Sequence, residues 1–277
     1  MVGQTVLERE TKGAGGGLAN HIAPHPVLDR YYTSSEDRSA FVRSLFTSSA
    51  HNYNRIEAVT SLGTGRWYRR KVLLEAGLKP GMRLLDVGCG TGLVAMPAAR
   101  IVGSGGHVLG VDPNEGMRSV ASAHGAFEVV EGVAGALPVD TGAFDMVTMG
   151  YALRHVDDLS AAFCEFARAL TPGGTVVVLE ITPPKSVPGR LAMKLIMCWI
   201  APAVSVAVTF GSDAWHLMRY LWDTVDQCVP PDRVLAALEN AGFKDVHRSV
   251  KVGVFSAYIG RKKLDDAVDS GRHGEGR

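Results

Sequence analysis

One stretch decides the fold: Leu84-Leu85-Asp86-Val87-Gly88-Cys89-Gly90-Thr91-Gly92, in which three alternate glycines follow an apolar run and precede a predicted helix. A chain that leaves a buried strand and enters a helix within a few residues must turn sharply. A side chain at that turn would also hold a ligand away from the backbone. We therefore expect Gly88, Cys89, Gly90 and Gly92 to lie against a nucleotide-bearing cofactor.

The spacing of the glycines disfavours a nicotinamide dinucleotide. The dinucleotide pattern places its third glycine three residues after the second, and Leu93 occupies that position. Asp86 would repel a pyrophosphate, whereas a carboxylate suits the sulfonium and ammonium groups of S-adenosylmethionine. Asp112 follows the next apolar stretch, 20 residues after Gly92, where a carboxylate binds ribose hydroxyls. The structural alternative for Asp112 is a simple turn residue before Pro113.

From residue 83 onward, apolar strand patterns alternate with helical patterns, which is typical of a parallel sheet covered on both faces. We expect strands at 83–87, 107–111, 126–130, 144–149 and 175–181. We expect helices at 91–102, 115–123, 157–170 and 231–241, with cap helices before the sheet at 38–48 and 65–77. The β-rich segment 246–261, interrupted by Gly253, fits a closing hairpin.

Five motifs in this order and spacing resemble those of class I S-adenosylmethionine-dependent methyltransferases. They are the glycine stretch, 111–117, 136–138, 144–147 and 170–174. Within that superfamily the chain is similar to the ubiquinone/menaquinone-biosynthesis C-methyltransferases from about Phe46 to Lys262. The segments that carry this similarity are 53–57, 61–67, 150–157 and 217–221. The resemblance implies an α/β fold, with a Rossmann-like seven-stranded mostly parallel sheet, helices on both faces, N-terminal cap helices and a helical lid insertion.

The resemblance also implies which residues bind S-adenosylmethionine. Gly88, Gly90 and Gly92 are assigned to its methionine part, Asp112 to the ribose and Met117 to the adenine face. Core packing is the alternative for Met117, because Met readily fills gaps. The remaining expected contacts are Asp86, Cys89, Pro113, Val133, Ala134 and Met149. Val133 departs from the family pattern, which has Asp or Asn there to bond the adenine amino group, so backbone groups such as the Ala134 amide are expected to hold the adenine.

Arg154-His155, just after the fourth predicted strand, resembles the Arg-Asn pair at which the quinol methyltransferases activate the acceptor through water. His155 replaces the Asn, and its unperturbed pKa of about 6.5 suits a direct base near physiological pH. We expect Arg154 to orient the acceptor or a water, because its guanidinium stays protonated, and Tyr53 to contact the acceptor from the cap. The structural alternative is that His155 packs against the loop while Asp157 caps the next helix.

An almost wholly apolar run, 191–210, lies in an insertion at about 186–228, which we expect to form a lid over an apolar acceptor. The aromatic side chains expected to contact the acceptor are Tyr31, Trp199, Trp215 and Trp222. A subunit interface is an equal alternative, and peripheral membrane contact stays open. Pro202 and Lys194 weigh against a transmembrane helix, although the run approaches the ~20 residues that span a bilayer.

The composition indicates one catalytic domain with additions. The chain has 277 residues, is 46% hydrophobic and 21% charged, and has a net charge of +1. It can therefore bury one sizeable core, and it has no basic footprint for nucleic acid. Four dispersed cysteines without a CxxC or a His cluster indicate reduced thiols and no metal site. The N-terminus has no apolar signal core, so we expect a cytoplasmic protein, and we expect a homo-oligomer.

The expected organisation has four parts. A flexible or docking N-terminal tail occupies 1–35, a helical cap 36–80, the methyltransferase domain 81–264, and a disordered tail 265–277. Composition supports the flexible tails, because the N-terminal region is rich in glycine and charge. Residues 27–32 could instead dock on the active site or on a neighbouring subunit.

Three functions are consistent with these features. The first is C-methylation of an apolar prenylated or aromatic small molecule, quinol-like or a secondary metabolite. The second is methylation of an isoprenoid double bond, which needs no base but forms a carbocation that aromatic faces stabilise. The third is a cofactor-binding scaffold that transfers no methyl group.

Overall fold

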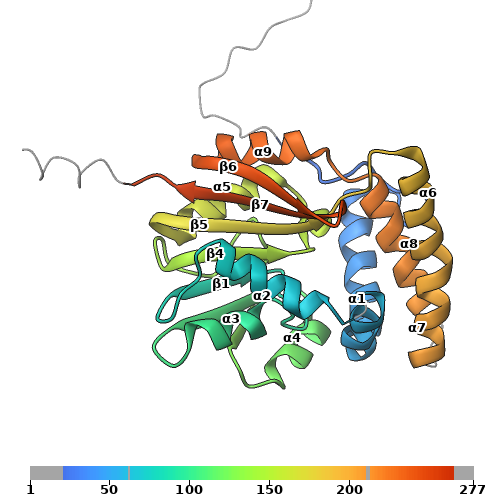
Figure 1. The fold of residues 1–277 in the computed structure, drawn as a ribbon, viewed down its shortest axis with the longest axis horizontal. Helices are drawn as coiled ribbons and strands as arrows, with labels where there is room; N and C mark the ends of the chain where they lie inside the picture. The colour runs from blue at the N-terminus through green and yellow to red at the C-terminus, as the bar shows by residue number, and fades with distance from the viewer. Residues whose placement is uncertain (1–20, 62, 210–212, 265–277) are drawn as a thin grey trace, which may run out of the picture.

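A computed structural model of the chain describes residues 21–61, 63–209 and 213–264. The predictions for residues 1–20 and 265–277, including the disordered C-terminal tail, lie outside the described residues. Figure 1 shows a central sheet with helices on both faces and a further group of helices standing beyond one end of the strands. The predicted α/β architecture is therefore confirmed.

The sheet has seven strands in the order β3-β2-β1-β4-β5-β7-β6. They are β1 (Arg83–Val87), β2 (His107–Asp112), β3 (Glu128–Glu131), β4 (Phe144–Gly150), β5 (Leu170–Ile181), β6 (Phe243–Lys251) and β7 (Phe255–Lys262). Neighbouring strands are parallel except at β7, which runs antiparallel to both β5 and β6. The predicted strands are confirmed, although β3 begins at Glu128 and β5 already at Leu170.

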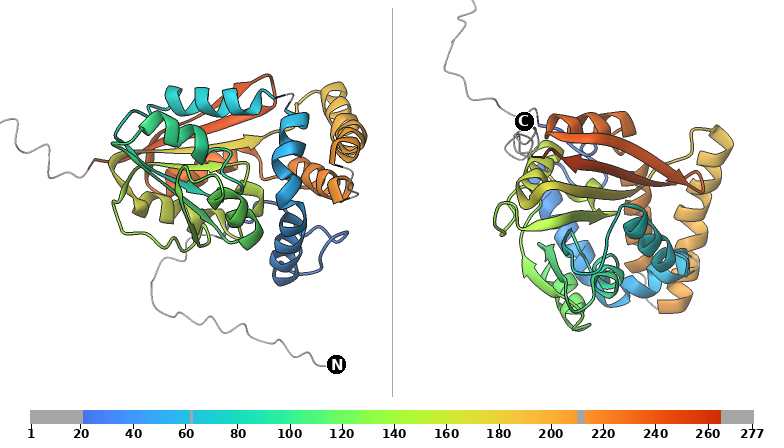
Figure 2. Two further views of the ribbon diagram at one scale, coloured as in Figure 1. Left: turned by 90° about the horizontal axis from the view of Figure 1, so that it is seen from below. Right: turned by 60° about the vertical axis from the view of Figure 1, so that its left-hand side comes forward.

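Two helical layers cover the sheet because its central strands are apolar on both faces. The helices of these layers are α2 (Gly65–Glu75), α3 (Ala95–Val102), α5 (Leu159–Ala169) and α9 (Pro231–Asn240). Leu73 of α2 and Ala98 of α3 pack against Leu84 on one face. Phe163 of α5 and Leu238 of α9 belong to the core on the other face. The left view in Figure 2 shows the sheet between the two helical layers.

The remaining long helices lie beyond the carboxyl ends of the parallel strands (Figure 1). They are α1 (Ser35–Thr60), α6 (Val187–Leu195), the π-helical turn η2 (Ile196–Ile200), α7 (Ala201–Thr209) and α8 (Asp213–Asp226). The short helix α4 (Glu115–Ser122) instead packs beside β2 and β3 and also contacts α1. The first cap helix is longer than predicted, since residues 35–60 contain no Gly or Pro to end it. Gly63, with a φ of 72°, follows its end.

The segment 21–34, predicted to be part of a flexible or docking tail, is docked on the domain. The amide of Ile22 donates to Asp158 Oδ1 at 3.0 Å, and Val229 donates to the Pro24 carbonyl at 2.7 Å. Leu28 and Tyr32 are buried against Tyr220 of α8. Of the two alternatives predicted for this segment, these contacts agree with docking, because its apolar side chains are buried against α8.

Candidate active site

A cavity of about 410 Å³ lies between α1 and the carboxyl ends of β1, β2 and β4. Ligands of open parallel sheets bind at this end of the strands. The predicted site residues that line the cavity are Tyr53, Asp86, Gly88, Cys89, Gly90, Asp112, Pro113, Met117, Val133, Ala134, Met149 and His155. Most of the predicted cofactor residues are therefore brought together in one place.

The glycine loop opens directly onto this cavity. Gly88 and Gly90 have positive φ values of 63° and 55°, which other residues adopt only with strain. A Cβ atom on Gly90 would meet no atom within 4 Å, so a ligand can approach the backbone there. Gly92 is a correction, because it does not line the cavity: its missing side chain makes room for the ring of Phe127, 2.5 Å from an added Cβ.

Asp112 organises the loop from the end of the neighbouring strand. Its Oδ2 accepts a hydrogen bond from the Gly90 amide and its Oδ1 accepts one from the Asn114 amide, both at 2.8 Å. Burial raises the pKa of this carboxyl, and the two amides oppose that rise. Asn114 in turn caps α4 by accepting from the Met117 amide and donates to the Arg43 carbonyl of α1. The helical cap and the loop are thus tied together.

Asp86 lies at the floor of the cavity with one oxygen unpaired. Thr148 donates to Asp86 Oδ1 at 2.8 Å, while Oδ2 is buried and has no hydrogen-bond partner among the described residues. Burial raises the pKa of Asp86 to about 7, against the opposing effects of Thr148 and the Ala95 backbone amide. A buried carboxylate oxygen without a partner is costly unless a cationic or hydrogen-bonding ligand meets it.

Arg69 lines the same part of the cavity and provides the opposite charge. Its Nη1 donates to Glu57 Oε1 at 2.7 Å, its guanidinium lies 5.0 Å from the centre of the Tyr151 ring, and its buried Nε has no partner in the described ranges. Tyr151 has a φ of 61°, which indicates backbone strain at this wall. A carboxylate acceptor and a guanidinium donor together fit the ammonium and carboxylate groups of an amino-acid moiety.

The other end of the predicted cofactor site is apolar. Met117 and Met149 are buried with their surfaces toward the cavity, and burial strongly raises the pKa of the Cys89 thiol, which stays uncharged. Val133 is 49% exposed and lines the cavity next to Ala134. Since Val133 has no polar side-chain atom, only backbone groups can bond a base edge at this position.

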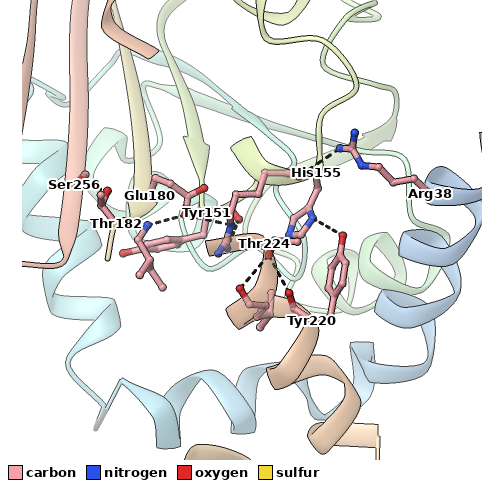
Figure 3. A network of polar contacts seen from close by, with 11 residues as sticks. Arg38, Tyr151, His155, Glu180, Thr182, Tyr220, Thr224 and Ser256 are labelled. Atoms are coloured by element: carbon pink, nitrogen blue, oxygen red, sulfur yellow. Dashed lines mark hydrogen bonds and ion pairs between the residues drawn. The ribbon is translucent and has the colours of Figure 1, made fainter. Parts of the chain in front are cut away.

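His155 lies where α1 and α8 meet the loop after β4. Figure 3 shows its ring facing Tyr220, whose hydroxyl is 3.4 Å from His155 Nδ1. Phe46 of α1 packs edge-on against the ring at 5.0 Å between centroids. Burial and the neighbouring charges of Arg154 and Arg38 hold the pKa of His155 well below 6.5, so the imidazole is neutral.

Arg154 does not reach the cavity, which corrects its predicted role as an orienting group. It is 2% exposed, its Nε lies 3.4 Å from Glu180 Oε1, and its Nη2 donates to the Tyr151 carbonyl. Burial raises the pKa of Glu180, and the Arg154 charge opposes that rise. The buried carboxylate draws the guanidinium into the wall behind His155, where Arg38 fixes the loop by donating to the Arg154 and Val156 carbonyls.

Asp158, and not Asp157, caps the following helix. The Asp158 Oδ1 accepts from the Ser160 amide at 2.9 Å and also from Ile22 of the docked segment. Asp157 is exposed at the rim of the cavity, 3.5 Å from the hydroxyl of Ser39. The β-region backbone of Asp158 lets its side chain fold back on the first turn.

The four aromatic residues predicted to contact the acceptor do not line the cavity. Trp222 is buried. Trp199 is 59% exposed and packs edge-on against Trp215, with 5.9 Å between the ring centroids. The Tyr31 hydroxyl donates to Asp223 of α8 at 2.6 Å, and the Tyr31 ring packs edge-on against Tyr220. Among the residues of the insertion that the structure describes, only Leu221 lines the cavity. The physical reason is that α1, longer than predicted, already covers the cavity, and the insertion packs outside α1.

Several lining residues were not predicted from the sequence. They are Arg38, Phe46, Arg69, Thr91, Asn114 and Tyr151. Asn54 of α1 accepts a hydrogen bond from Thr91 of the loop at 2.5 Å. The signal that could have found part of this set is polar or charged residues on the cap helices, which have few reasons to face inward other than a ligand.

Comparisons with known proteins find matches over most of the chain. The model of the "ubiE/COQ5 methyltransferase family" matches residues 32–262. The "Ubiquinone/menaquinone biosynthesis C-methyltransferase UbiE" of Shewanella halifaxensis is 30% identical over 236 residues, which is 82% of this chain and 93% of the relative. The "Demethylmenaquinone methyltransferase" of Symbiobacterium thermophilum is 31% identical over 242 residues, which is 84% of this chain and 96% of the relative.

Solved structures share the fold at lower identity. A SAM-dependent methyltransferase from Aquifex aeolicus superposes with a TM-score of 0.53 at 20% identity, covering 74% of this chain and 97% of its own. Phosphoethanolamine N-methyltransferase 2 of Haemonchus contortus, in complex with S-adenosyl-L-methionine, gives a TM-score of 0.52 at 16% identity and covers 72% of this chain and 53% of its own. These likenesses concern the fold.

Proposed function

The chain belongs to the ubiE/COQ5 methyltransferase family and is an S-adenosylmethionine-dependent methyltransferase; from this premise we propose that it C-methylates a prenylated quinol or a closely related prenylated aromatic. The names of its relatives, which act in ubiquinone and menaquinone biosynthesis, support a quinone-type acceptor. The single observation that carries the proposal is that His155 lines the cavity, where burial and the neighbouring arginines lower the pKa of its imidazole.

The residues of the cavity fit S-adenosylmethionine along its length. The unpaired Asp86 Oδ2 fits the ammonium group, the Arg69 guanidinium the carboxylate, and Asp112 the ribose hydroxyls. Met117, Met149 and Val133 provide apolar surface for the adenine. When bound, the cofactor supplies a methyl group on a positively charged sulfur.

His155 is assigned the role of base. A quinol carbon becomes nucleophilic when the neighbouring hydroxyl loses its proton, because electron density then moves onto the ring. The imidazole is neutral and can take that proton on Nε2, which has no hydrogen-bond partner among the described residues. The tautomer that leaves Nε2 free carries its hydrogen on Nδ1, directed at the Tyr220 oxygen.

The acceptor must displace a side chain to meet Nε2, since that atom is buried. Phe46 both contacts the ring and lines the cavity, so it is the side chain that has to turn aside. Tyr53 packs against Phe46 with ring centroids 6.1 Å apart, and burial raises its pKa. A neutral Tyr53 hydroxyl is therefore assigned to hold the acceptor by a hydrogen bond rather than to remove a proton.

The remaining chemistry follows from these positions. The acceptor carbon forms a bond to the methyl carbon as the bond from that carbon to sulfur breaks. The proton on the methylated ring carbon then leaves to water, and the proton held on His155 Nε2 returns to the hydroxyl oxygen, so that the aromatic quinol is restored and the neutral imidazole is regenerated. Exclusion of water by α1 and the alignment of the two reactants provide the rest of the rate.

An acceptor panel tests the proposal. The full chain is incubated with S-adenosylmethionine and, separately, prenylated quinols, prenyl-indoles and isoprenyl diphosphates, and products are identified by mass spectrometry. A methyl gain on the ring carbon of a quinol supports the proposal. A gain only on an isoprenoid double bond overturns it in favour of carbocation chemistry. Cofactor binding by calorimetry without product anywhere in the panel overturns it in favour of a scaffold.

A further inference from the structure

The insertion forms one long helix with an exposed apolar face. Residues Val187–Ala207, through α6, η2 and α7, are continuous and long enough, at 21 residues, to span a bilayer by length and composition. The exposed apolar side chains are Val187, Leu191, Leu195, Ile196, Trp199, Ile200 and Val204. Their spacing of mostly four residues places them along one side of the helix, which we call the α6–α7 apolar face.

The opposite side of this helix is packed against the protein. Ala201 and Ser205 are buried, and Ala201 contacts the cluster that includes Ile56 of α1 and Leu217 of α8. Figure 1 shows α6 and α7 as the outermost layer, with α8 and α1 between them and the sheet. A helix held in this way cannot cross a bilayer, but it can lie in the plane of one with its apolar face inward.

The charged residues near the α6–α7 apolar face are basic, which favours an anionic partner. Residues 185–209 contain three basic residues, Lys185, Arg190 and Lys194, and no Asp or Glu. Lys185 and Lys194 are exposed, whereas Arg190 pairs with Asp226 of α8 at 2.8 Å. Basic side chains beside an apolar face with an exposed Trp complement the headgroups and the boundary region of an anionic lipid surface.

The apolar face is also connected with the cavity through the interior. The cluster behind it contains Met197 and Val206 of the helix and extends to Phe46, Tyr53 and Leu221, which line the cavity. Apolar side chains are therefore continuous from the outer helix to the acceptor side of the cavity. Such continuity is what a protein needs when its acceptor dissolves in lipid.

We propose that the α6–α7 apolar face docks the protein on the surface of an anionic lipid bilayer. The helix lies in the interface with Leu191, Trp199 and Ile200 among the acyl chains and Lys194 at the headgroup level. The argument from interior continuity rests on the proposed apolar acceptor, but vesicle binding is measured without the acceptor, so docking can fail or succeed independently of the acceptor's identity.

Flotation with vesicles tests the docking. The full chain is mixed with phosphatidylcholine vesicles with and without phosphatidylglycerol, and the bound fraction is measured. We expect binding to the anionic vesicles that salt weakens. The double variant L191E/I200E should reduce the partition coefficient about tenfold or more, while the control L264E, an equally exposed leucine at the other end of the sheet, should not. S-adenosylmethionine binding shows that each variant is folded.

Fluorescence gives a second test that does not depend on stability. Bromine-labelled acyl chains quench a tryptophan that enters the bilayer, so quenching should be present in the wild type, lost in W199F and kept in W67F. Equal quenching in W199F overturns the proposal. A second result would also overturn the proposal. If the wild type does not bind vesicles, and light scattering shows a dimer for the wild type but a monomer for L191E/I200E, the face is an interface between two copies of the chain.

Discussion

The hydroxyl of Tyr220 lies 3.4 Å from Nδ1 of His155, and the two rings stack with centroids 5.7 Å apart. This contact joins the inserted α8 to the loop after β4, and Figure 3 shows Tyr220 on the side of the imidazole facing α8. It fixes the orientation of the ring and leaves Nε2 as the basic nitrogen. The insertion therefore reaches the site by contacting the proposed base, His155, and of its described residues only Leu221 lines the cavity.

Replacing His155 tests the base directly. His155→Ala should lower kcat by about 10²–10⁴-fold, the usual contribution of general base catalysis. His155→Asn, which restores the residue type of the family, should retain more activity because Asn can still position a water. Cofactor affinity should be unchanged in both variants, and calorimetry checks this. Full turnover in both would mean that His155 is structural.

The pH profile of the wild type provides an independent check. Because burial and two arginines lower the pKa of His155, its protonation, which removes the base, occurs only below pH 6.5. The acid limb of kcat/KM should therefore lie below pH 6.5 and should be absent in His155→Asn. In Tyr220→Phe we expect a lower kcat, with little change in KM since Tyr220 does not line the cavity. An acid limb above 6.5 that persists in His155→Asn would assign it to another group.

The Arg154–Glu180 pair should behave as a structural ion pair. Both side chains are almost fully buried, so removing one partner by Arg154→Met or Glu180→Leu should cost about 3–5 kcal/mol in the free energy of unfolding. The double variant should recover most of that loss, because no charge is left unpaired.

Urea denaturation measures these changes, with the exposed pair Lys71–Glu75 as a control. Replacing Lys71 should cost about 0–1 kcal/mol. If Arg154→Met has wild-type stability but a strongly reduced kcat, Arg154 orients the acceptor or a water, as the sequence predicts, and is not only a structural residue.

Asp86 should link stability to pH. Its pKa is raised from 3.8 to about 7 by burial, so between these values the folded state binds more protons than the unfolded state. The stability of the cofactor-free protein should then fall as pH rises from about 4 to 7, by about 3–5 kcal/mol from this group. Asp86→Asn should remove that slope, and denaturation at several pH values measures it.

The same residue should make cofactor binding release protons. Since an ammonium group favours the ionised carboxylate, affinity should increase as pH rises toward 7. Calorimetry in buffers of different ionisation enthalpy counts the protons. Asp86→Asn should bind the cofactor about 10–100-fold more weakly and release none near neutral pH. Proton release equal to that of the wild type would show that Asp86 does not meet the ammonium group.

Asp112→Ala should weaken cofactor binding by about 1.5–3 kcal/mol through lost charge-assisted hydrogen bonds. Part of this loss comes from the loop, because Asp112 also accepts from Gly90 and Asn114. An analogue without ribose hydroxyls separates the two effects. The wild type should discriminate strongly against it, and Asp112→Ala should not. Discrimination that persists in the variant would refute the ribose assignment.

The sheet and the glycine-loop end of the cavity were predictable because their signals are local. Strand β1, the glycine loop and Asp112 are short patterns in which apolar period, turn chemistry and spacing agree. Leu84 and Leu85 are buried, as a central parallel strand requires. Within the loop, the prediction fails only for Gly92, which does not line the cavity. A glycine is also required where a ring packs on the backbone, as Phe127 does at Gly92.

The acceptor end was not predictable because it depends on long-range packing. Whether Arg154 faces a ligand or a buried carboxylate is decided by Glu180 on another strand. The length of α1 decides whether the tryptophans pack over the cavity or over α1 itself. The end of a helix is difficult to predict from the periodicity of its sequence. The inward-facing Arg69 has no distinguishing local pattern at all.

The most direct test of the central claim compares a prenylated quinol with its oxidised quinone as acceptor. Each is incubated with S-adenosylmethionine and either the wild type or His155→Ala, and methylated product is quantified by mass spectrometry with fragmentation to locate the methyl group. The account predicts ring methylation of the quinol by the wild type, little with His155→Ala and none of the quinone, which has no hydroxyl proton to remove. Equal methylation of quinol and quinone, or equal rates with both proteins, would contradict it.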